Sequence, residues 1–215
     1  MNSVRAIIFD FNGTLSDDEP ILCEIYRDLF AGYGRPLSAQ QYFDELAGHS
    51  EEEIMRRWLG PDVNLESAVA ERIARYRATV RDGSTIGEPV RAAVRYAAEH
   101  VPLAIVSGAA RAEIEPVVEA AGLAPFFRAT VSADEVVHGK PHPEGYLRAL
   151  ELLGDDLQPG HVIAFEDTEA GVSSAKAAGM RCIAVRGTLE PERLRAADEL
   201  VAGITPTLLH SLLDD

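Results

Sequence analysis

The stretch RAIIFDFNGTL, residues 5–15, begins with a short apolar run and changes character at Asp10. The run at 5–9 is apolar at every position after Arg5, which is typical of a strand buried on both faces of a parallel sheet. Asp10 follows directly, and Gly13-Thr14 then provides a flexible turn with a hydroxyl group. The stretch therefore predicts a buried strand that carries a carboxylate at its carboxyl end.

Further runs of the same kind recur along the chain, separated by segments with apolar residues at helical spacing. This alternation of strand and helix predicts an α/β fold, a doubly wound parallel sheet. The predicted strands are 5–9, 102–106, 129–131, 162–165, 182–185 and, more weakly, 200–204. The predicted helices between them are 88–100, 111–122, 143–154 and 168–179.

The segment 16–87 interrupts this alternation, because it contains helical patterns and no convincing strand. The patterns cover 19–33, 38–47, 50–59 and 65–81. We predict a core made of residues 1–15 and 88–215, with a small all-helical cap domain, residues 16–87, inserted after the first strand. The alternative is that these helices simply pack on the sheet.

The composition excludes several classes of protein. Of the 215 residues, 47% are hydrophobic and 26% are charged, which argues against disorder. The net charge of −15 predicts no binding to nucleic acid or to anionic membranes. Neither a signal peptide nor a membrane-spanning run is recognisable, so we expect a cytoplasmic protein. We expect a monomer or a weak homodimer.

Polar residues follow several of the predicted strands. Asp10 follows the first, Ser107 the second, and Glu166-Asp167 the fourth. In an open parallel sheet, ligands bind outside the carboxyl ends of the strands. Carboxylates that lie close together repel one another and are tolerated when a cation lies between them, and oxygen ligands suit Mg²⁺. These residues therefore predict a Mg²⁺ site at this edge.

A phosphate group is expected at the same edge. The turns at Thr14 and at Ser107-Gly108 offer hydroxyl and backbone N–H groups, which bind anions. Lys140, one of two lysines in the chain, lies in a loop before a helix, where an ammonium group neutralises phosphoryl charge. The alternative is a set of solvated strand ends and an exposed lysine.

These motifs, in this order, resemble those of the haloacid dehalogenase-like hydrolase superfamily, in particular its phosphatases with a helical cap. The resemblance rests on residues 10–15 (DFNGTL), Ser107, Lys140 and residues 165–171 (FEDTEAG). It implies a Rossmann-like three-layer core and hydrolysis of a small phosphorylated metabolite. Asp10 would be the nucleophile that forms an aspartyl phosphate. Mg²⁺ would be held by Asp10, the backbone carbonyl of Asn12, Glu166 and Asp167, and the phosphoryl oxygens by Thr14, Ser107, Gly108 and Lys140.

Asn12 departs from the family pattern, which usually has a second Asp here as general acid and base. An amide does neither at neutral pH, and losing such help slows a reaction about 10²- to 10⁴-fold. Three interpretations remain open: a phosphatase that tolerates Asn12, a non-phosphatase member such as a β-phosphoglucomutase-like phosphotransferase, and a weak or inactive phosphometabolite binder. One hypothesis is that Asp17 or Asp18 replaces the missing group, although acidic residues at a helix start also favour its dipole.

Substrate choice is expected to depend on the cap. His49 is a candidate for contact with the substrate, and a plain surface residue is the alternative. Arg56 and Arg57 are candidates for a second anionic group of the substrate, and a solvated helix face is the alternative.

Overall fold

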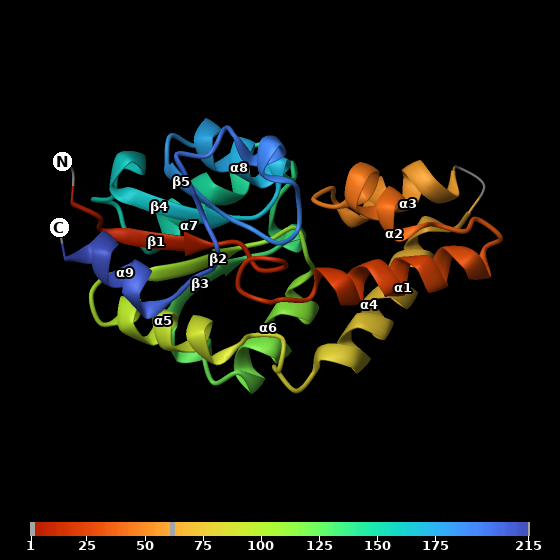
Figure 1. Ribbon diagram of the computed structural model, residues 1–215, viewed down its shortest axis with the longest axis horizontal. Helices are drawn as coiled ribbons and strands as arrows, with labels where there is room; N and C mark the ends of the chain where they lie inside the picture. Colours follow the sequence, from red (N-terminus) through yellow and green to blue (C-terminus); the bar gives the residue numbers. More distant parts are fainter. Residues whose placement is uncertain (1–2, 61–62, 215) are drawn as a thin grey trace.

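One sheet of six parallel strands forms the centre of the computed structural model, which describes residues 3–60 and 63–214 (Figure 1). Residues 1, 2, 61, 62 and 215, which fall in the predicted core and cap ranges, lie outside this description. The strand order is β3-β2-β1-β4-β5-β6. The predicted α/β class is confirmed, and each predicted run overlaps a strand. The strands are β1 Ala6–Phe9, β2 Leu103–Val106, β3 Phe127–Val131, β4 Val162–Glu166, β5 Arg181–Val185 and β6 Glu199–Val201.

Two layers of helices cover the faces of the sheet, as the fully apolar strands require. Ile7 and Phe9 of β1 face the cluster that includes α5, α6 and α9, whereas Ala6 and Ile8 face α7 and α8. The helices are α5 Glu88–Ala98, α6 Arg111–Ala120, α7 Glu144–Leu153, α8 Glu169–Ala177 and α9 Pro206–Leu213. Helix α9 was not predicted, although Thr205 caps it and Pro206 begins it.

The helical cap lies between β1 and β2 in the chain, and in Figure 1 helices α1–α4 stand beside the carboxyl ends of the strands. These helices are α1 Glu19–Gly32, α2 Ala39–Gln41, α3 Glu51–Leu59 and α4 Leu65–Val80, and the segment ends with α5, which contacts α9. The predicted helix at 38–47 is the short α2 followed by a π-helical turn, Tyr42–Leu46. A domain boundary at residues 16 and 87 stays a prediction.

The two connections between sheet and cap run side by side. Ser16 Oγ donates a hydrogen bond to Thr85 Oγ1 at 2.7 Å, and the backbone N–H of Asp17 donates to the Thr85 carbonyl at 2.9 Å. The core and the cap are also in contact at Arg193, which donates to the carbonyl of Phe43 in the cap at 3.1 Å. These contacts tie the cap to the core both at the connections and away from them. Within residues 3–60 and 63–214, no helix is long and apolar enough to cross a membrane.

Candidate active site

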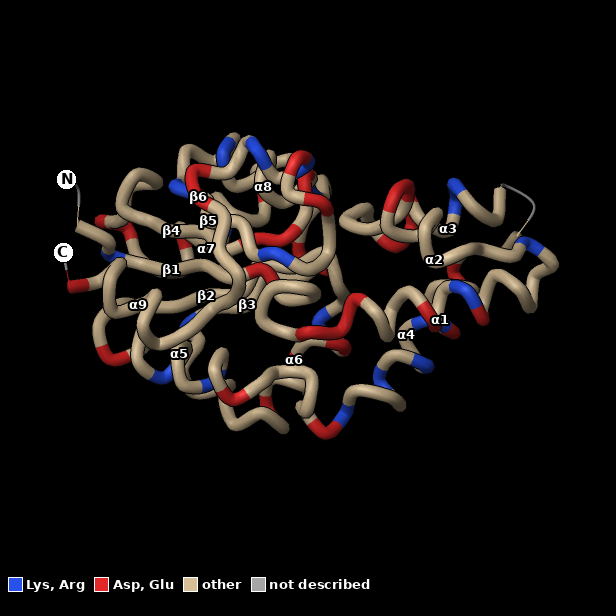
Figure 2. The backbone as a smooth tube through the Cα atoms, viewed as in Figure 1, with Lys and Arg blue, Asp and Glu red and all other residues tan. Residues whose placement is uncertain are grey.

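The order of the strands reverses between β1 and β4, and at such a point an open α/β sheet leaves a crevice. Asp10 follows β1, Glu166 ends β4 and Asp167 comes next, so three acidic residues meet beside this crevice. Figure 2 shows acidic residues along the side of the core that faces the cap. The structure thus brings together the carboxylates that the strand ends predicted.

Lys140 joins two of these carboxylates. Its Nζ lies 2.5 Å from Asp10 Oδ1 and 2.6 Å from Glu166 Oε1, and it donates to the Val106 carbonyl at 3.2 Å. Glu144 closes the loop that carries Lys140, since its carboxylate accepts two backbone N–H groups of that loop at 2.7 and 3.0 Å. The ammonium group is therefore held in a fixed place between Asp10 and Glu166.

Glu166 is fully buried and firmly held. Tyr146 donates its hydroxyl to Glu166 Oε1 at 2.7 Å. On the other side, helix α8 approaches so closely at Gly171 that an added Cβ would lie 1.8 Å from Glu166 Oε2. Only glycine leaves room for the carboxylate at that point.

Asp167 is likewise fully buried and accepts two hydroxyl groups. Thr14 donates to its Oδ1 at 3.2 Å, and Thr188 donates to its Oδ2. A Cβ at Gly13 would lie 2.0 Å from Asp167 Oδ2, and the backbone of Gly13 has a φ of +71°. Thr14, predicted as a phosphate ligand, therefore contacts a carboxylate of the acidic cluster in this structure.

The charges of the cluster do not balance, because three carboxylates share one ammonium group. Burial raises the pKa of Asp10 to about 7, with Lys140 opposing the shift and Glu166 adding to it. Burial also raises the pKa of Asp167 well above its ordinary value, and the carboxylates of Asp10, Glu19 and Glu166 add to that rise. Burial alone would lower the pKa of Lys140, but Asp10 and Glu166 outweigh it and raise that pKa.

A hard divalent cation fits this cluster. Ligand oxygens of Asp10, Glu166 and Asp167 all lie within 4.8 Å of one another. An oxygen-only donor set with excess negative charge is the set that Mg²⁺ prefers. The fit thus comes from both the geometry and the uncompensated charge of the site.

The raised pKa values predict that the protein without metal loses stability as the pH rises. The folded state holds protons on Asp10 and on Glu19, whose pKa burial and the Asp18 carboxylate raise to about 8, whereas the unfolded chain has released them. Because the folded state binds more protons, the free energy of unfolding falls with increasing pH. We expect a loss on the order of 3 kcal/mol between pH 6 and pH 8 in EDTA.

Thermal unfolding at both pH values, in EDTA and in Mg²⁺, measures this effect. Mg²⁺ should remove the part of the pH dependence that comes from Asp10, since the cation replaces the proton on that carboxylate, and leave the part that comes from Glu19. Equal stability at pH 6 and pH 8 in EDTA would contradict the prediction.

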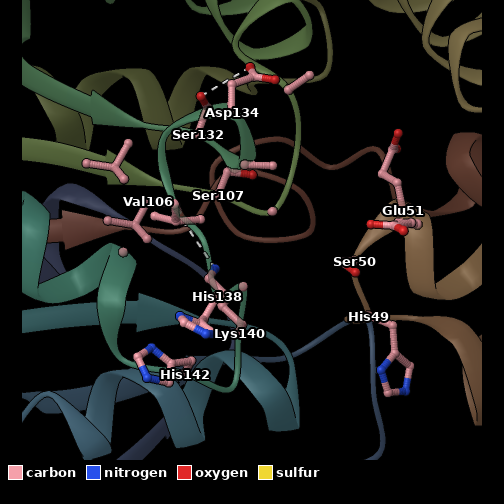
Figure 3. Close-up of a pocket in the computed structure, with 18 of the residues that line it drawn as sticks. His49, Ser50, Glu51, Val106, Ser107, Ser132, Asp134, His138, Lys140 and His142 are labelled. Carbon is pink, nitrogen blue, oxygen red and sulfur yellow. Dashed lines mark hydrogen bonds between the residues drawn. The ribbon is translucent and has the colours of Figure 1, made fainter. Parts of the chain in front are cut away.

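A cavity of about 380 Å³ opens above Asp10 between the core and the cap. Figure 3 shows Ser107, Ser132 and Lys140 on the core side of this cavity and His49, Ser50 and Glu51 of the cap across from them. Gly108 also lines it. Ser107 Oγ accepts the backbone N–H of Ala109 at 3.1 Å, which leaves its hydroxyl hydrogen available as a donor.

The cap residues predicted from the sequence take different places. His49 lines the cavity, but its Nδ1 lies 3.3 Å from Glu53 and its Nε2 lies 3.1 Å from Arg57. Arg56 and Arg57 pair with glutamates one turn earlier in α3, and neither is among the described residues that line the cavity. These arginines therefore lie on a solvated face, the alternative that the sequence had left open.

Asn12 turns its amide toward the cap junction. Its Nδ2 donates to Asp18 Oδ2 at 3.0 Å and to the Tyr76 hydroxyl at 3.3 Å. Asp18 is fully buried, whereas Asp17 is exposed. Burial raises the pKa of Asp18 to about 6, and hydrogen bonds from Tyr76, Ser16 and Asn12 oppose the shift.

Three residues of the site escaped the sequence reasoning. Thr188 follows β5 closely, so the strand-end pattern that singled out Asp10 could have found it. Tyr146 and Tyr76 lie within helices, and no local pattern marks a tyrosine whose hydroxyl reaches a carboxylate in a distant segment.

Comparisons with known proteins agree with this architecture. A family model described as haloacid dehalogenase-like hydrolase matches residues 7–185. Protein CbbY of Rhodobacter capsulatus is 31% identical over 212 residues, covering 93% of this chain and 90% of that protein. A phosphorylated carbohydrates phosphatase of Thermotoga maritima is 31% identical over 185 residues, covering 84% of each chain. The crystal structure of a mutant CbbY from Rhodobacter sphaeroides in complex with xylulose-(1,5)bisphosphate has a TM-score of 0.83 and 25% identity, covering 94% of this chain and 95% of that one.

Proposed function

The chain belongs to the haloacid dehalogenase-like hydrolase family, in the branch with a helical cap after the first strand, and from this premise we propose that it hydrolyses a small phosphate monoester. The phosphoryl group is transferred first to Asp10 and then to water. One observation carries the proposal: the Asp10 carboxylate, fixed by Lys140 at 2.5 Å, lies at a cavity that Ser107 also lines.

Each residue of the site has a distinct task in this reaction. A carboxylate oxygen of Asp10 attacks phosphorus, and the bond from phosphorus to the ester oxygen breaks. Lys140, Ser107 and the backbone at Gly108 bind the phosphoryl oxygens. Water then attacks phosphorus and the bond from phosphorus to Asp10 breaks. This step regenerates the Asp10 carboxylate and releases inorganic phosphate. Thr14 and Thr188 hold Asp167 in place through both steps.

Asp10, Glu166, Asp167 and the backbone carbonyl of Asn12 would hold Mg²⁺. When bound, the cation supplies charge neutralisation for the phosphoryl group. The chain's own residues provide the rest: Lys140 keeps Asp10 oriented, and the cap shields the cavity from bulk water.

Asn12 determines which esters react fast. An amide cannot protonate the departing oxygen or accept a proton from water. Aryl phosphates need little help, because a phenolate leaves readily, whereas alkyl phosphates need a proton. We therefore expect aryl phosphates to react faster than alkyl phosphates.

The experiment that tests the function is phosphate release from an aryl phosphate, with Mg²⁺ and with EDTA. Release that requires Mg²⁺ supports the phosphatase. Phosphate release that is absent, while phosphate and Mg²⁺ still bind, would favour a silent phosphometabolite binder. Transfer of the phosphoryl group to a second sugar in place of water would favour a phosphotransferase.

The charges around the cavity favour a substrate whose remainder is uncharged. Glu51, Glu52 and Asp134 line the cavity. Glu51 and Glu52 pair with Arg72 and Arg56, whereas Asp134 is in no ion pair of the described residues. Lys140 is the one Lys or Arg among its described lining residues. Arg72, the buried cation of the cap, is engaged by Glu51 and Glu113. We propose monophosphates of polyhydroxylated compounds, such as sugar monophosphates, as the substrate class.

This substrate class predicts discrimination against a second anionic group. A second phosphate near these carboxylates is repelled by roughly 1 to 4 kcal/mol. We therefore expect kcat/KM for a hexose monophosphate to exceed that for the matching bisphosphate at least about tenfold. Glu52→Gln should reduce the ratio of kcat/KM for the monophosphate to kcat/KM for the bisphosphate, and it should leave monophosphate turnover nearly unchanged. A preference for the bisphosphate would contradict the assignment.

A further inference from the structure

Asn12, Asp18 and Tyr76 form a closed set of hydrogen bonds at the junction of core and cap. Asn12 Nδ2 donates to Asp18 Oδ2 at 3.0 Å and to Tyr76 Oη at 3.3 Å, and Tyr76 Oη donates to the same Asp18 oxygen. Asp18 and Tyr76 have no exposed surface. The Asn12 amide nitrogen is therefore directed to the junction.

Asp18 is held by donors and not by a positive charge. Its other oxygen, Oδ1, accepts the backbone N–H of Gly13 at 3.3 Å. Among the ion pairs of the described residues, none includes Asp18. A buried carboxylate without a cation depends on neutral donors, and the Asn12 amide supplies one of them beside Tyr76 and Gly13.

The orientation of the Asn12 amide follows from this contact. A carboxylate accepts and does not donate, so the amide nitrogen must face Asp18 and the amide oxygen must face away. An Asp at position 12 would instead place two carboxylates about 3 Å apart in a buried site, where like charges oppose each other's ionisation.

We propose that Asp18 is a positioning residue for Asn12, and that the two form a matched pair in which Asp18 makes the amide at position 12 necessary. The proposal rests on the proposed function where it concerns turnover. The pair fixes the loop between β1 and α1 and commits the amide nitrogen of Asn12 to the junction. The amide at position 12 then has no acidic proton to give to an alkyl leaving group.

Exchanging both residues tests the pair. Asn12→Asp/Asp18→Asn keeps the hydrogen bond with donor and acceptor reversed, and it puts a carboxyl group at position 12. That group gives its proton to the departing oxygen as the P–O bond breaks, and it takes a proton from the water that later attacks phosphorus. We expect kcat for fructose 1-phosphate to rise about 10²-fold or more, within the range of general acid–base catalysis.

The single variants show whether Asp18 positions the residue at position 12 or whether the two residues act independently. Asn12→Asp alone should gain at least about tenfold less than the double variant, because its new carboxylate faces Asp18. In the double variant, kcat/KM for p-nitrophenyl phosphate should change far less than kcat/KM for fructose 1-phosphate, because kcat/KM reports the first step and p-nitrophenolate leaves without a proton. A purely structural role would change both substrates alike. Asp17→Asn, an exposed neighbour of the same chemistry, should leave both rates unchanged.

Thermal unfolding of the same variants gives a readout that does not need phosphatase activity. Asn12→Asp should lower Tm by several degrees, and adding Asp18→Asn should restore most of the loss. If Tm is restored but no variant releases phosphate, the proposed function fails and the pair stands. If Asn12→Asp alone equals the double variant in Tm and in turnover of fructose 1-phosphate, the two residues are independent and the pair is refuted.

Discussion

Asp10→Asn is expected to reduce phosphate release from an aryl phosphate about 10⁵-fold or more while the protein stays folded. The amide keeps the shape of the side chain and an oxygen that accepts from Lys140, whose Nζ lies 2.5 Å from Asp10 Oδ1. It removes the nucleophilic oxygen that forms the aspartyl phosphate. Losses of this size are typical when the nucleophile of a covalent mechanism is removed.

Acid-quenched protein, weighed intact during turnover, shows whether Asp10 carries the phosphoryl group. The wild type should accumulate one added phosphoryl group, because Asn12 cannot activate the water that releases it. Asp10→Asn should carry none. Asp134→Asn makes the same change elsewhere on the cavity wall and should stay within tenfold of the wild type. Comparable turnover by Asp10→Asn would exclude the covalent route.

The sequence predicted the parts of this site that depend on regular secondary structure. Asp10, Glu166 and Asp167 were found because they follow buried strands, and parallel strands bring their carboxyl ends to one edge. The central strands β1, β2, β4 and β5 were found from their apolar runs, since strands buried on both faces are apolar. The edge strands β3 and β6 are partly exposed, and their runs were shorter or weaker. The polar residues that follow the apolar strands were therefore the clearest guide to the site, because the topology of the sheet brings them together from distant parts of the chain.

Contacts between side chains of distant segments could not be predicted. Tyr76 lies 58 residues from Asp18, and Arg72 lies 41 residues from Glu113. Helical spacing marks these residues only as members of a helix face. The hydrogen bond between Asn12 and Asp18 spans six residues, but its geometry depends on how the loop after β1 turns back. The sequence places Asp18 at the start of a helix but does not indicate which side chain its carboxylate contacts.

The second large effect concerns Arg72, which joins the cap to the core. Arg72 lies in α4 and is 4% exposed. Its guanidinium pairs with Glu51 of α3 and with Glu113 of the core helix α6, and its Nε donates to the Tyr26 hydroxyl at 3.3 Å. One buried cation therefore satisfies carboxylates from both parts of the molecule.

Arg72→Met is expected to lower the free energy of unfolding by about 3–5 kcal/mol, because it leaves buried carboxylates without a partner. Glu113 is 1% exposed, and burial raises its pKa even with Arg72 beside it. Without Arg72 that pKa rises further, so Glu113 binds a proton in the folded state that the unfolded chain has released. The loss of stability should therefore be larger at pH 8 than at pH 5.

Urea unfolding of three variants separates the buried pair from ordinary surface charge. Arg75→Met is the matched control on the same helix, since Arg75 pairs with Glu71 in solvent at 2.5 Å and such pairs contribute about 0.5 kcal/mol or less. Arg72→Met/Glu113→Gln should recover part of the loss, because the new side chain is neutral and still accepts the backbone N–H of Ala110, as Glu113 does at 3.2 Å. A loss from Arg72→Met no greater than that from Arg75→Met would show that the cap docks on the core without this cation. A large loss that the second substitution relieves would instead identify the unpaired Glu113 charge as its cause.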